Sequence, residues 1–236
     1  MSSSSTIVMP GDRIAAIEEV AKSKRVILGP GLRRLDETVV ATKAGPLRHK
    51  EPNTFWVDNY QRRYVPARGD LVVGIVKAKA GDQFRVDIGS ADMASISYLS
   101  FESATKKNRP DLNPGDLIYA RVLVASADVE PELVCVNSNG KRGKLGILAD
   151  GFFFKCSLNL GRLLLRENCP ALAALKRQLP YEIAVGVNGR IWVKAQALRE
   201  TVALANSILA LEQAGYAEID KVCDNLDGFM EHRISF

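Results

Sequence analysis

Seven cationic side chains and three aromatic rings between residues 70 and 125 are the residues of this chain best suited to hold a single-stranded nucleic acid. The cations are Lys77, Lys79, Arg85, Lys106, Lys107, Arg109 and Arg121, and the rings are Phe84, Tyr98 and Tyr119. Lys and Arg bind phosphates without reading sequence, and aromatic faces stack on unpaired bases. The alternative for the cations is a solvated surface. The alternative for the rings is core packing, which their places in alternating strands favour.

Residues for catalysis or metal binding do not cluster in the sequence. The two histidines, His49 and His232, have no adjacent nucleophile or carboxylate pair. We find no H-E-x-x-H, no phosphate-binding glycine loop and no carboxylates spaced for two metals. The cysteines have neither metal-clip spacing nor disulfide density, which favours a reducing compartment: they are Cys135, Cys156, Cys169 and Cys223. We therefore expect no metal and no cofactor, and an enzyme such as a nuclease is the alternative that these observations disfavour.

The net charge of +5 is unevenly distributed along the 236 residues. Residues 1–66 carry 11 Lys and Arg against 7 Asp and Glu, which gives +4, whereas residues 67–143 carry 10 against 10. The segment with the candidate cations is thus neutral, which argues against a broad basic face. No run of about 18 apolar residues predicts a membrane span, and residues 1–6 lack the features of a secretory signal.

The candidate cations lie in a segment, residues 67–143, that reads as five short strands. Apolar and polar residues alternate with period two, as in half-buried strands, and Gly81-Asp82 and Asn113-Pro114-Gly115 supply turns. The predicted strands are Asp70–Ala78, Gln83–Gly89, Ala94–Tyr98, Asp116–Ala125 and Glu132–Asn137. Five strands with a longer insertion after the third are typical of the OB-fold barrel. That insertion carries Lys106, Lys107 and Arg109.

Residues 1–66 predict a small β-rich domain after a polar tail. One or two helical turns are expected within Arg13–Arg25, and Gly and Pro then punctuate short strands. These strands are expected at Val26–Leu28, Thr38–Ala41, Phe55–Val57 and Tyr64–Pro66, with turns at Gly29–Gly31 and Gly45-Pro46.

Residues 144–236 change to a mixed pattern. A strand at Gly151–Ser157 precedes helices at Leu158–Glu167 and Pro170–Leu179, the second with Pro at its first position. Asn188-Gly189 between Tyr181–Val187 and Arg190–Lys194 predicts a two-residue hairpin turn with both residues at positive φ. A helix at Gln196–Gln213 follows, and an extra C-terminal helix would bury Ile219, Val222, Cys223, Leu226 and Met230. Without that last helix, the order β-α-α-β-β-α is that of a KH domain.

The hairpin glycines occupy an unusual place for a KH domain. RNA-binding KH domains clamp the backbone with a Gly-x-x-Gly loop between their first two helices, but here that connection, Arg166–Pro170, contains no glycine. We therefore predict structural roles, including packing against the OB domain, for Gly186, Asn188, Gly189 and Trp192.

The predicted fold is thus mainly β plus α/β in three domains: residues 1–66, an S1-type OB barrel at 67–143, and a KH-like domain at 144–236. This arrangement resembles the S1/KH-type cap subunits of the RNA exosome, and in particular the exosome component 3 family. The segments that carry the resemblance are Leu28–Leu32, Lys106–Pro110, Pro114–Arg121, Gly146–Leu148 with Asp150-Gly151, and Gly186–Lys194.

The resemblance implies a subunit that cuts nothing itself. It would sit on a ring of RNase-PH-like subunits beside other cap subunits, stabilise that ring, and help to guide single-stranded RNA toward an associated 3′-to-5′ exonuclease. It further implies residence in the nucleus and nucleolus and also in the cytoplasm. RNA contacts would then belong to the seven barrel cations. The alternative function is a free-standing OB/KH RNA-binding factor in translation or ribosome assembly.

Overall fold

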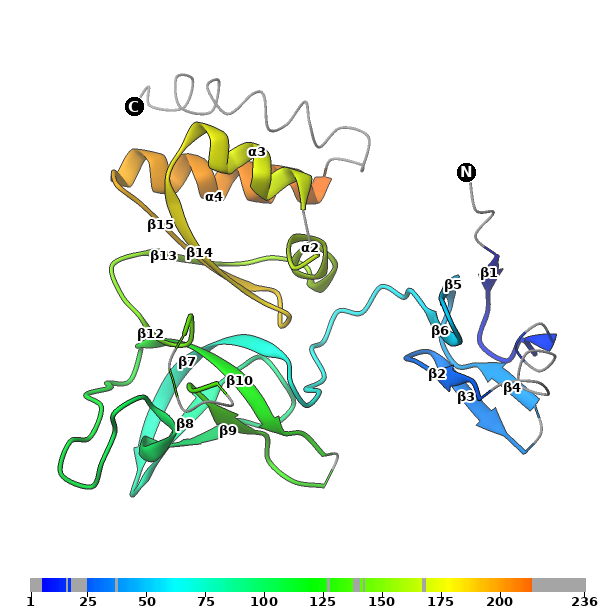
Figure 1. The fold of residues 1–236 in the computed structure, drawn as a ribbon, viewed down its shortest axis with the longest axis horizontal. Coiled ribbons are helices and arrows are strands. Elements are labelled where there is room, and N and C mark those ends of the chain that lie inside the picture. The colour runs from blue at the N-terminus through cyan, green and yellow to red at the C-terminus, as the bar shows by residue number, and fades with distance from the viewer. Residues whose placement is uncertain are drawn as a thin grey trace. The chain divides into compact units, whose positions relative to one another are not determined.

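The computed structural model describes residues 6–15, 17, 25–36, 38–126, 128–137, 141, 143–166 and 169–213. The chain divides into two compact units, Met1–Gln61 and Arg62–Phe236 (Figure 1). Most of the helix predicted within Arg13–Arg25, and the whole extra helix predicted after residue 213, lie outside the described residues. Among the described helices, none has the length and apolar character needed to cross a bilayer.

The first unit is built from short strands around a small apolar core. A four-stranded sheet has the order β1-β5-β6-β2, and β3 and β4 form a separate hairpin. The strands are β1 (Ile7–Val8), β2 (Ile27–Leu28), β3 (Leu32–Leu35), β4 (Thr38–Ala41), β5 (Gly45–Lys50) and β6 (Thr54–Val57). Fully buried Ile17 and Val57 lie in the apolar core of this unit, together with Val39 and Phe55.

Two predictions for this region are wrong. The expected Gly45-Pro46 turn is instead the start of β5, because β1, which the sequence pattern did not reveal, pairs Ile7 with Pro46. The expected strand at Tyr64–Pro66 is irregular. Tyr64 is buried there against the barrel core, and its hydroxyl donates a hydrogen bond of 2.8 Å to Asp70. A side chain anchored in this way fixes the entry to the barrel without strand pairing.

The second unit begins with a closed barrel of the five strands that were predicted. They are β7 (Leu71–Ala80), β8 (Gln83–Asp87), β9 (Ala94–Ser97), β10 (Leu117–Val124) and β11 (Glu132–Val134). Neighbouring strands follow the order β11-β9-β8-β7-β10, and β11 pairs with both β9 and β10, which closes the barrel. A further strand, β12 (Gly146–Leu148), extends the sheet beyond β10. Val76, Val86 and Ile96 point into the barrel and are fully buried or nearly so.

The KH part is a three-stranded sheet covered by helices. Its sheet has the order β13 (Phe152–Lys155), β15 (Arg190–Ala195), β14 (Tyr181–Gly186). Its helices are α2 (Leu158–Leu164), α3 (Pro170–Gln178) and α4 (Leu198–Gln213). Ser157 caps α2 by accepting a hydrogen bond of 3.2 Å from the Leu160 N–H, and Pro170 begins α3 as predicted.

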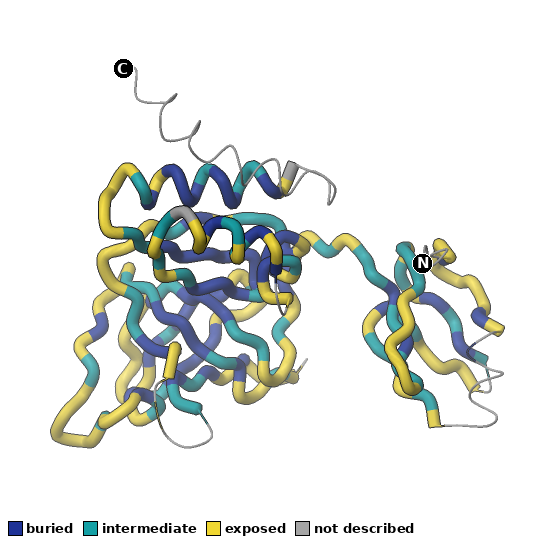
Figure 2. The backbone as a smooth tube through the Cα atoms, turned by 45° about the horizontal axis from the view of Figure 1, so that its top comes forward, coloured by how far each residue is buried: buried dark blue, intermediate teal, exposed yellow. Residues whose placement is uncertain are grey.

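The KH sheet is apolar on both faces because each face packs against a different layer. Phe154, Ile191 and Val193 pack with the helices, whereas Phe153 and Trp192 belong to the core cluster of the barrel. Figure 1 shows the sheet between helices α3 and α4 on one side and the barrel on the other, and Figure 2 shows buried backbone running through this middle layer. The predicted fold class, with its S1-type barrel and KH domain, is confirmed.

Candidate nucleic-acid interface

The outer face of the barrel has one part that is covered and one part that is open. Alternation along the strands directs Val73 of β7 and Tyr119 of β10, which are register partners, toward the KH sheet, and both are buried. On β8 and β9, the same alternation directs Arg85 and its register partner Ser95 outward. Arg85 remains partly exposed, and its partner on β7 is Ala78. This second part of the face is open at Arg85, which lies between exposed Ala78 and buried Ser95.

Arg85 is paired with an acid from the same barrel. Its guanidinium forms an ion pair with Glu130, two residues before β11. The next residue, Pro131, is buried and its carbonyl accepts a hydrogen bond of 2.9 Å from the Ser95 N–H. The chain thus holds Glu130 beside the strand that neighbours Arg85.

Two more of the predicted cations lie beside acids at the end of the barrel formed by the β7–β8 turn. Arg109 lies 3.1 Å from Asp82 of that turn, and its guanidinium sits 4.5 Å from the centroid of the Tyr98 ring. Lys79 lies 4.0 Å from Asp111. These contacts tie the insertion between β9 and β10 to the β7–β8 hairpin, so Arg109 is an anchor of that insertion.

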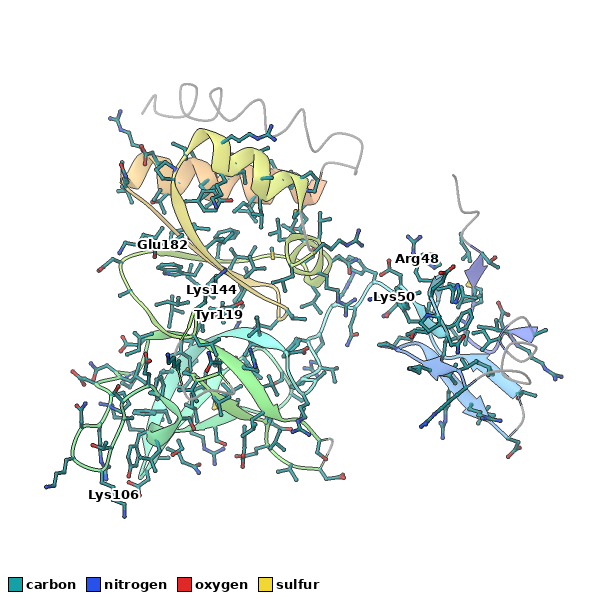
Figure 3. The ribbon with its side chains drawn as sticks, in the orientation of Figure 1. Arg48, Lys50, Lys106, Tyr119, Lys144 and Glu182 are labelled. Atoms are coloured by element: carbon teal, nitrogen blue, oxygen red, sulfur yellow. The ribbon has the colours of Figure 1, made fainter. Side chains whose placement is uncertain are left out.

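Lys106 and Lys107 lie at the outer tip of the same insertion. Both are exposed, and neither forms an ion pair with any residue that the structure describes. Reciprocal hydrogen bonds of 3.0 Å between Thr105 and Asn108 close the turn that presents them. Figure 3 shows Lys106 at the end of the barrel far from the KH sheet. These two ammonium groups are therefore available to a phosphate backbone.

The last two predicted cations lie elsewhere on the barrel. Lys77 is the extra residue of a β-bulge, because Val76 pairs with Val86 while Ala78 pairs with Arg85. Arg121 projects outward from β10 and is half-buried. The structure thus brings Lys79, Lys106, Lys107 and Arg109 to one end of the barrel, and leaves Lys77, Arg85 and Arg121 apart.

The three candidate aromatic rings are buried, as core packing requires. Phe84 meets Phe101 edge-on at 6.4 Å, and Tyr98 lies beneath Arg109. The Tyr119 hydroxyl donates a hydrogen bond of 3.0 Å to the Val185 carbonyl of the KH sheet, and burial raises the pKa of Tyr119 to about 12. None of the three offers an open face to a base in this conformation.

The KH hairpin reaches the barrel through Asn188. This side chain is buried, and its amide accepts from the Val73 N–H at 3.3 Å and donates to the Val73 carbonyl at 2.9 Å. It also donates to the Ile88 carbonyl at 2.8 Å, and the Val187 N–H donates to Leu71 at 2.8 Å. Strand β8 pairs with β7 only from Ile75 onward. The KH hairpin therefore supplies the hydrogen bonds of a neighbouring strand to the first residues of β7.

The two glycines of this hairpin are needed for different reasons. Gly189 has φ of +68°, which favours glycine, whereas Asn188 does not share a positive φ. The loop therefore has three residues, since Gly186 pairs with Arg190, and the predicted two-residue turn is wrong. Gly186 approaches the barrel closely, because a Cβ at this position would lie 2.8 Å from the Val73 nitrogen. Trp192 is buried nearby, in the cluster that joins the KH sheet to the barrel.

An ion pair between buried Arg190 and partly exposed Asp87 crosses the same boundary. Arg190 is 5% exposed, and its guanidinium lies 2.9 Å from the Asp87 carboxylate at the end of β8. Burial raises the pKa of Asp87, but the Gly89 N–H and the Arg190 charge outweigh it, so the net pKa of Asp87 is lowered. Together with Asn188, this pair fixes the KH sheet on the barrel.

Three family models match this chain in the order of its structural parts. The N-terminal region of the mammalian exosome complex component RRP40 matches residues 6–60, the RRP40 S1 domain matches 64–146, and a KH domain matches 151–199. Exosome complex component RRP40 of Drosophila melanogaster is 81% identical over 231 residues, covering 98% of this chain and all of that protein. The chain belongs to the RRP40 family. Human RRP40 is 50% identical over 195 residues, which cover 80% of this chain and 71% of the human protein.

A solved structure supports the fold of this RRP40-family chain. A crystal structure assigned to an exosome complex RNA-binding protein aligns with a TM-score of 0.60 over 73% of this chain and 99% of its own, at 22% identity. The RRP40 S1 match includes all seven predicted cations, and the KH match includes the hairpin residues from Gly186 to Trp192.

Sequence reasoning missed three residues of this RRP40-family chain that the structure makes prominent: Glu130, Asp87 and Arg190. Glu130 and its partner Arg85 are 45 residues apart, and Asp87 and Arg190 are 103 apart. Periodicity gives no signal for pairs at such distances. The one available hint was the position of Arg190, a charged residue opening an otherwise apolar run that ends at Val193.

Among the described residues, no group of three or more His, Cys, Asp and Glu side chains is placed to hold a metal ion. Cys135 and Cys169 are buried, and Cys156 is partly buried with a pKa raised to about 12, mainly by burial and also by Glu212. Cys223 and His232 lie outside the described residues.

Proposed function

We propose that this chain is a non-catalytic cap subunit of the RNA exosome. In this role it stabilises the ring of RNase-PH-like subunits and helps to guide single-stranded RNA into the central channel for 3′-to-5′ processing and degradation. The observation that carries the proposal is the 81% identity to an exosome complex component over the full length of that relative. We further propose that the chain works in the nucleus and nucleolus and also in the cytoplasm.

The geometry supports an RNA contact that is weak and insensitive to sequence. Lys106 and Lys107 are the exposed cations without an ion-pair partner in the described insertion, whereas Lys79, Arg85 and Arg109 each lie beside a local acid. Two or three phosphate contacts give only a shallow dependence of affinity on salt. A subunit with such weak affinity needs the rest of the assembly to keep RNA near it. This weak affinity fits a subunit that lines an RNA path better than a protein that binds RNA on its own.

The connection between barrel and KH sheet supports a scaffold role. Asn188, Arg190 and Tyr119 join the two parts with hydrogen bonds, and their shared core leaves little freedom between them. A rigid body of this kind can hold a loop such as Lys106-Lys107 at a constant place relative to its partners.

The test is a tagged pull-down from cell extract at moderate salt after nuclease treatment, with the co-purifying chains identified by mass spectrometry. Stoichiometric recovery of RNase-PH-like chains, other cap proteins and an associated exonuclease is the expected result. Recovery of the chain alone, or with ribosomal proteins that disappear after nuclease treatment, would overturn the proposal in favour of a free-standing RNA-binding factor.

A further inference from the structure

The open part of the barrel face could bind a single anion at Arg85. Arg85 projects from the middle of β8, and its register partners on either side are Ala78 and Ser95. Neither neighbour is large enough to cover the guanidinium, which can therefore present its planar set of N–H donors to an incoming oxyanion. The side chain of Arg85 is 39% exposed even with its present partner in place.

That site is already filled by a carboxylate of the same chain. Glu130 forms the ion pair with Arg85 while remaining 52% exposed itself. Its backbone is held in place, because the carbonyl of the following Pro131 accepts a hydrogen bond from Ser95 on β9. The carboxylate thus occupies the position that a phosphate oxygen would take at a free arginine.

We propose that Glu130 is a tethered competitor that occupies the anion site of Arg85 until a phosphodiester of single-stranded RNA displaces it. This inference rests on the RNA contact in the proposed function and adds the group that limits it. Exposed ion pairs are weak, so the displacement lowers RNA affinity only about 1.5- to 5-fold. The competition keeps a moving strand from being held tightly at this face.

The expected sign of the salt effect follows from charge exchange. When a phosphate replaces Glu130 at Arg85, the RNA releases a counterion while the freed carboxylate recruits one. In a variant without the Glu130 carboxylate, RNA binding still releases the counterion but no counterion is taken up in exchange. The slope of log affinity against log salt should therefore become steeper by up to about 0.7, the value for one phosphate contact on a single strand.

The experiment measures binding of the full chain to a labelled single-stranded RNA by fluorescence anisotropy across a range of salt. Glu130→Gln is expected to bind about 1.5 to 5 times more tightly than the wild type, with the steeper slope. The matched control is Glu132→Gln, which makes the same change in net charge. Glu132 is exposed and faces outward on β11 as the register partner of Ser95, about two strand spacings from Arg85.

A second pair of variants ties the gain to Arg85. In an Arg85→Gln background, Glu130→Gln should give no gain in affinity. Equal gains from Glu130→Gln and Glu132→Gln, or a gain that persists without Arg85, would overturn the inference and leave only an effect of net charge. Thermal unfolding of each variant identifies any loss of folded protein.

The inference and the proposed function can fail separately. If the chain assembles with the exosome subunits but neither the wild type nor Glu130→Gln binds RNA, the competitor is refuted and the assembly role stands. If Glu130→Gln gains affinity through Arg85 but the chain recovers no exosome subunits, the competitor stands and the cap role is refuted.

Discussion

The side-chain amide of Asn188 forms a two-point hydrogen bond with the backbone of Val73, accepting from its N–H and donating to its carbonyl. The same geometry would be supplied by a neighbouring strand, and β8 no longer supplies it at this end of β7. The S1 barrel of this RRP40-family chain is thus completed by the KH hairpin.

We expect Asn188→Ala to lower the free energy of unfolding by about 2–4 kcal/mol. The substitution leaves the N–H of Val73 and the carbonyls of Val73 and Ile88 buried without these partners, and each such group costs about 1–3 kcal/mol if unrelieved. Urea unfolding followed by tryptophan fluorescence measures the change, since Trp192 lies at the same boundary. Asn159→Ala on the exposed side of α2 is the control. A loss within about 0.5 kcal/mol for both variants, as at ordinary surface sites, would show that water replaces the amide.

The Asp87–Arg190 pair predicts a pH-dependent stability. Because the pKa of Asp87 is lower in the folded chain than its ordinary value of 3.8, the unfolded chain binds the proton more readily. The stabilisation is therefore present above pH 3.8 and is lost as the pH falls through the folded-state pKa. We expect Asp87→Asn to cost about 1–3 kcal/mol near neutral pH, because it leaves buried Arg190 without a counter-charge.

The measurement for this pair is a set of urea unfolding curves from neutral pH downward, for the wild type and Asp87→Asn. The difference between the two proteins should begin to shrink near pH 3.8, where Asp87 of the unfolded wild type takes up a proton. It should be lost once the pH is below the lower pKa of folded Asp87. Asp92→Asn, an exposed residue of the adjoining loop, is the control and should track the wild type. A constant difference between wild type and Asp87→Asn at every pH would mean that the charge on Asp87 is irrelevant.

Tyr119→Phe isolates one hydrogen bond between the barrel and the KH sheet. The phenol donates to the Val185 carbonyl at 3.0 Å, and its loss should cost about 0.5–1.5 kcal/mol without disturbing the packing of the ring. Tyr60→Phe is the matched control, because that ring is 67% exposed. Thermal or urea unfolding gives the comparison, and equal behaviour of the two variants would contradict a structural role for the Tyr119 hydroxyl.

The cations of the β9–β10 insertion should separate into two functional groups. Replacing both Lys106 and Lys107 by Gln should weaken RNA delivery by the assembled complex, with no change in assembly or thermal stability. The slope of log RNA affinity against log salt concentration should become shallower by about 1.4, the value for two phosphate contacts on a single strand. Arg109→Gln should instead loosen the insertion, because Arg109 binds Asp82 and covers Tyr98.

Nuclease assays on reconstituted complexes test this difference. The control is Lys176→Gln with Arg177→Gln, which removes the same charge from exposed positions on α3. If the Lys106 and Lys107 variant fails to enter the complex, the insertion is a protein contact and its assignment to RNA is refuted.

Local pattern was sufficient for most elements of this chain. Alternation identified the barrel strands, and Pro170 marked the start of α3, because each depends on neighbouring residues only. The strand β1 escaped prediction because two residues carry no periodicity, and with it the true role of Gly45-Pro46 was missed. The turn at Asn188 was assigned the wrong length because the Asn188 side chain bonds to the backbone of Val73 in the barrel. Rules for hairpin turns consider neighbouring residues only and do not include such a contact.

The candidate site was less accessible to sequence reasoning. The sequence identified which cations exist, and the structure separates exposed Lys106 and Lys107 from Lys79, Arg85 and Arg109, each held by an acid. These acids come from turns and loops between the strands of the barrel. Which cation is neutralised depends on how the barrel closes, and closure joins segments with no shared local pattern.

The bond between Asn188 and Val73 also sets an order of events during synthesis. The two residues are 115 positions apart, so the ribosome releases the whole barrel sequence well before the hairpin that completes it. Until then the first residues of β7 lack that partner, and Tyr119 lacks its acceptor on β14. Long-range pairings of this kind slow folding and expose intermediates to aggregation. A nascent chain truncated before the hairpin should therefore be a client for chaperones.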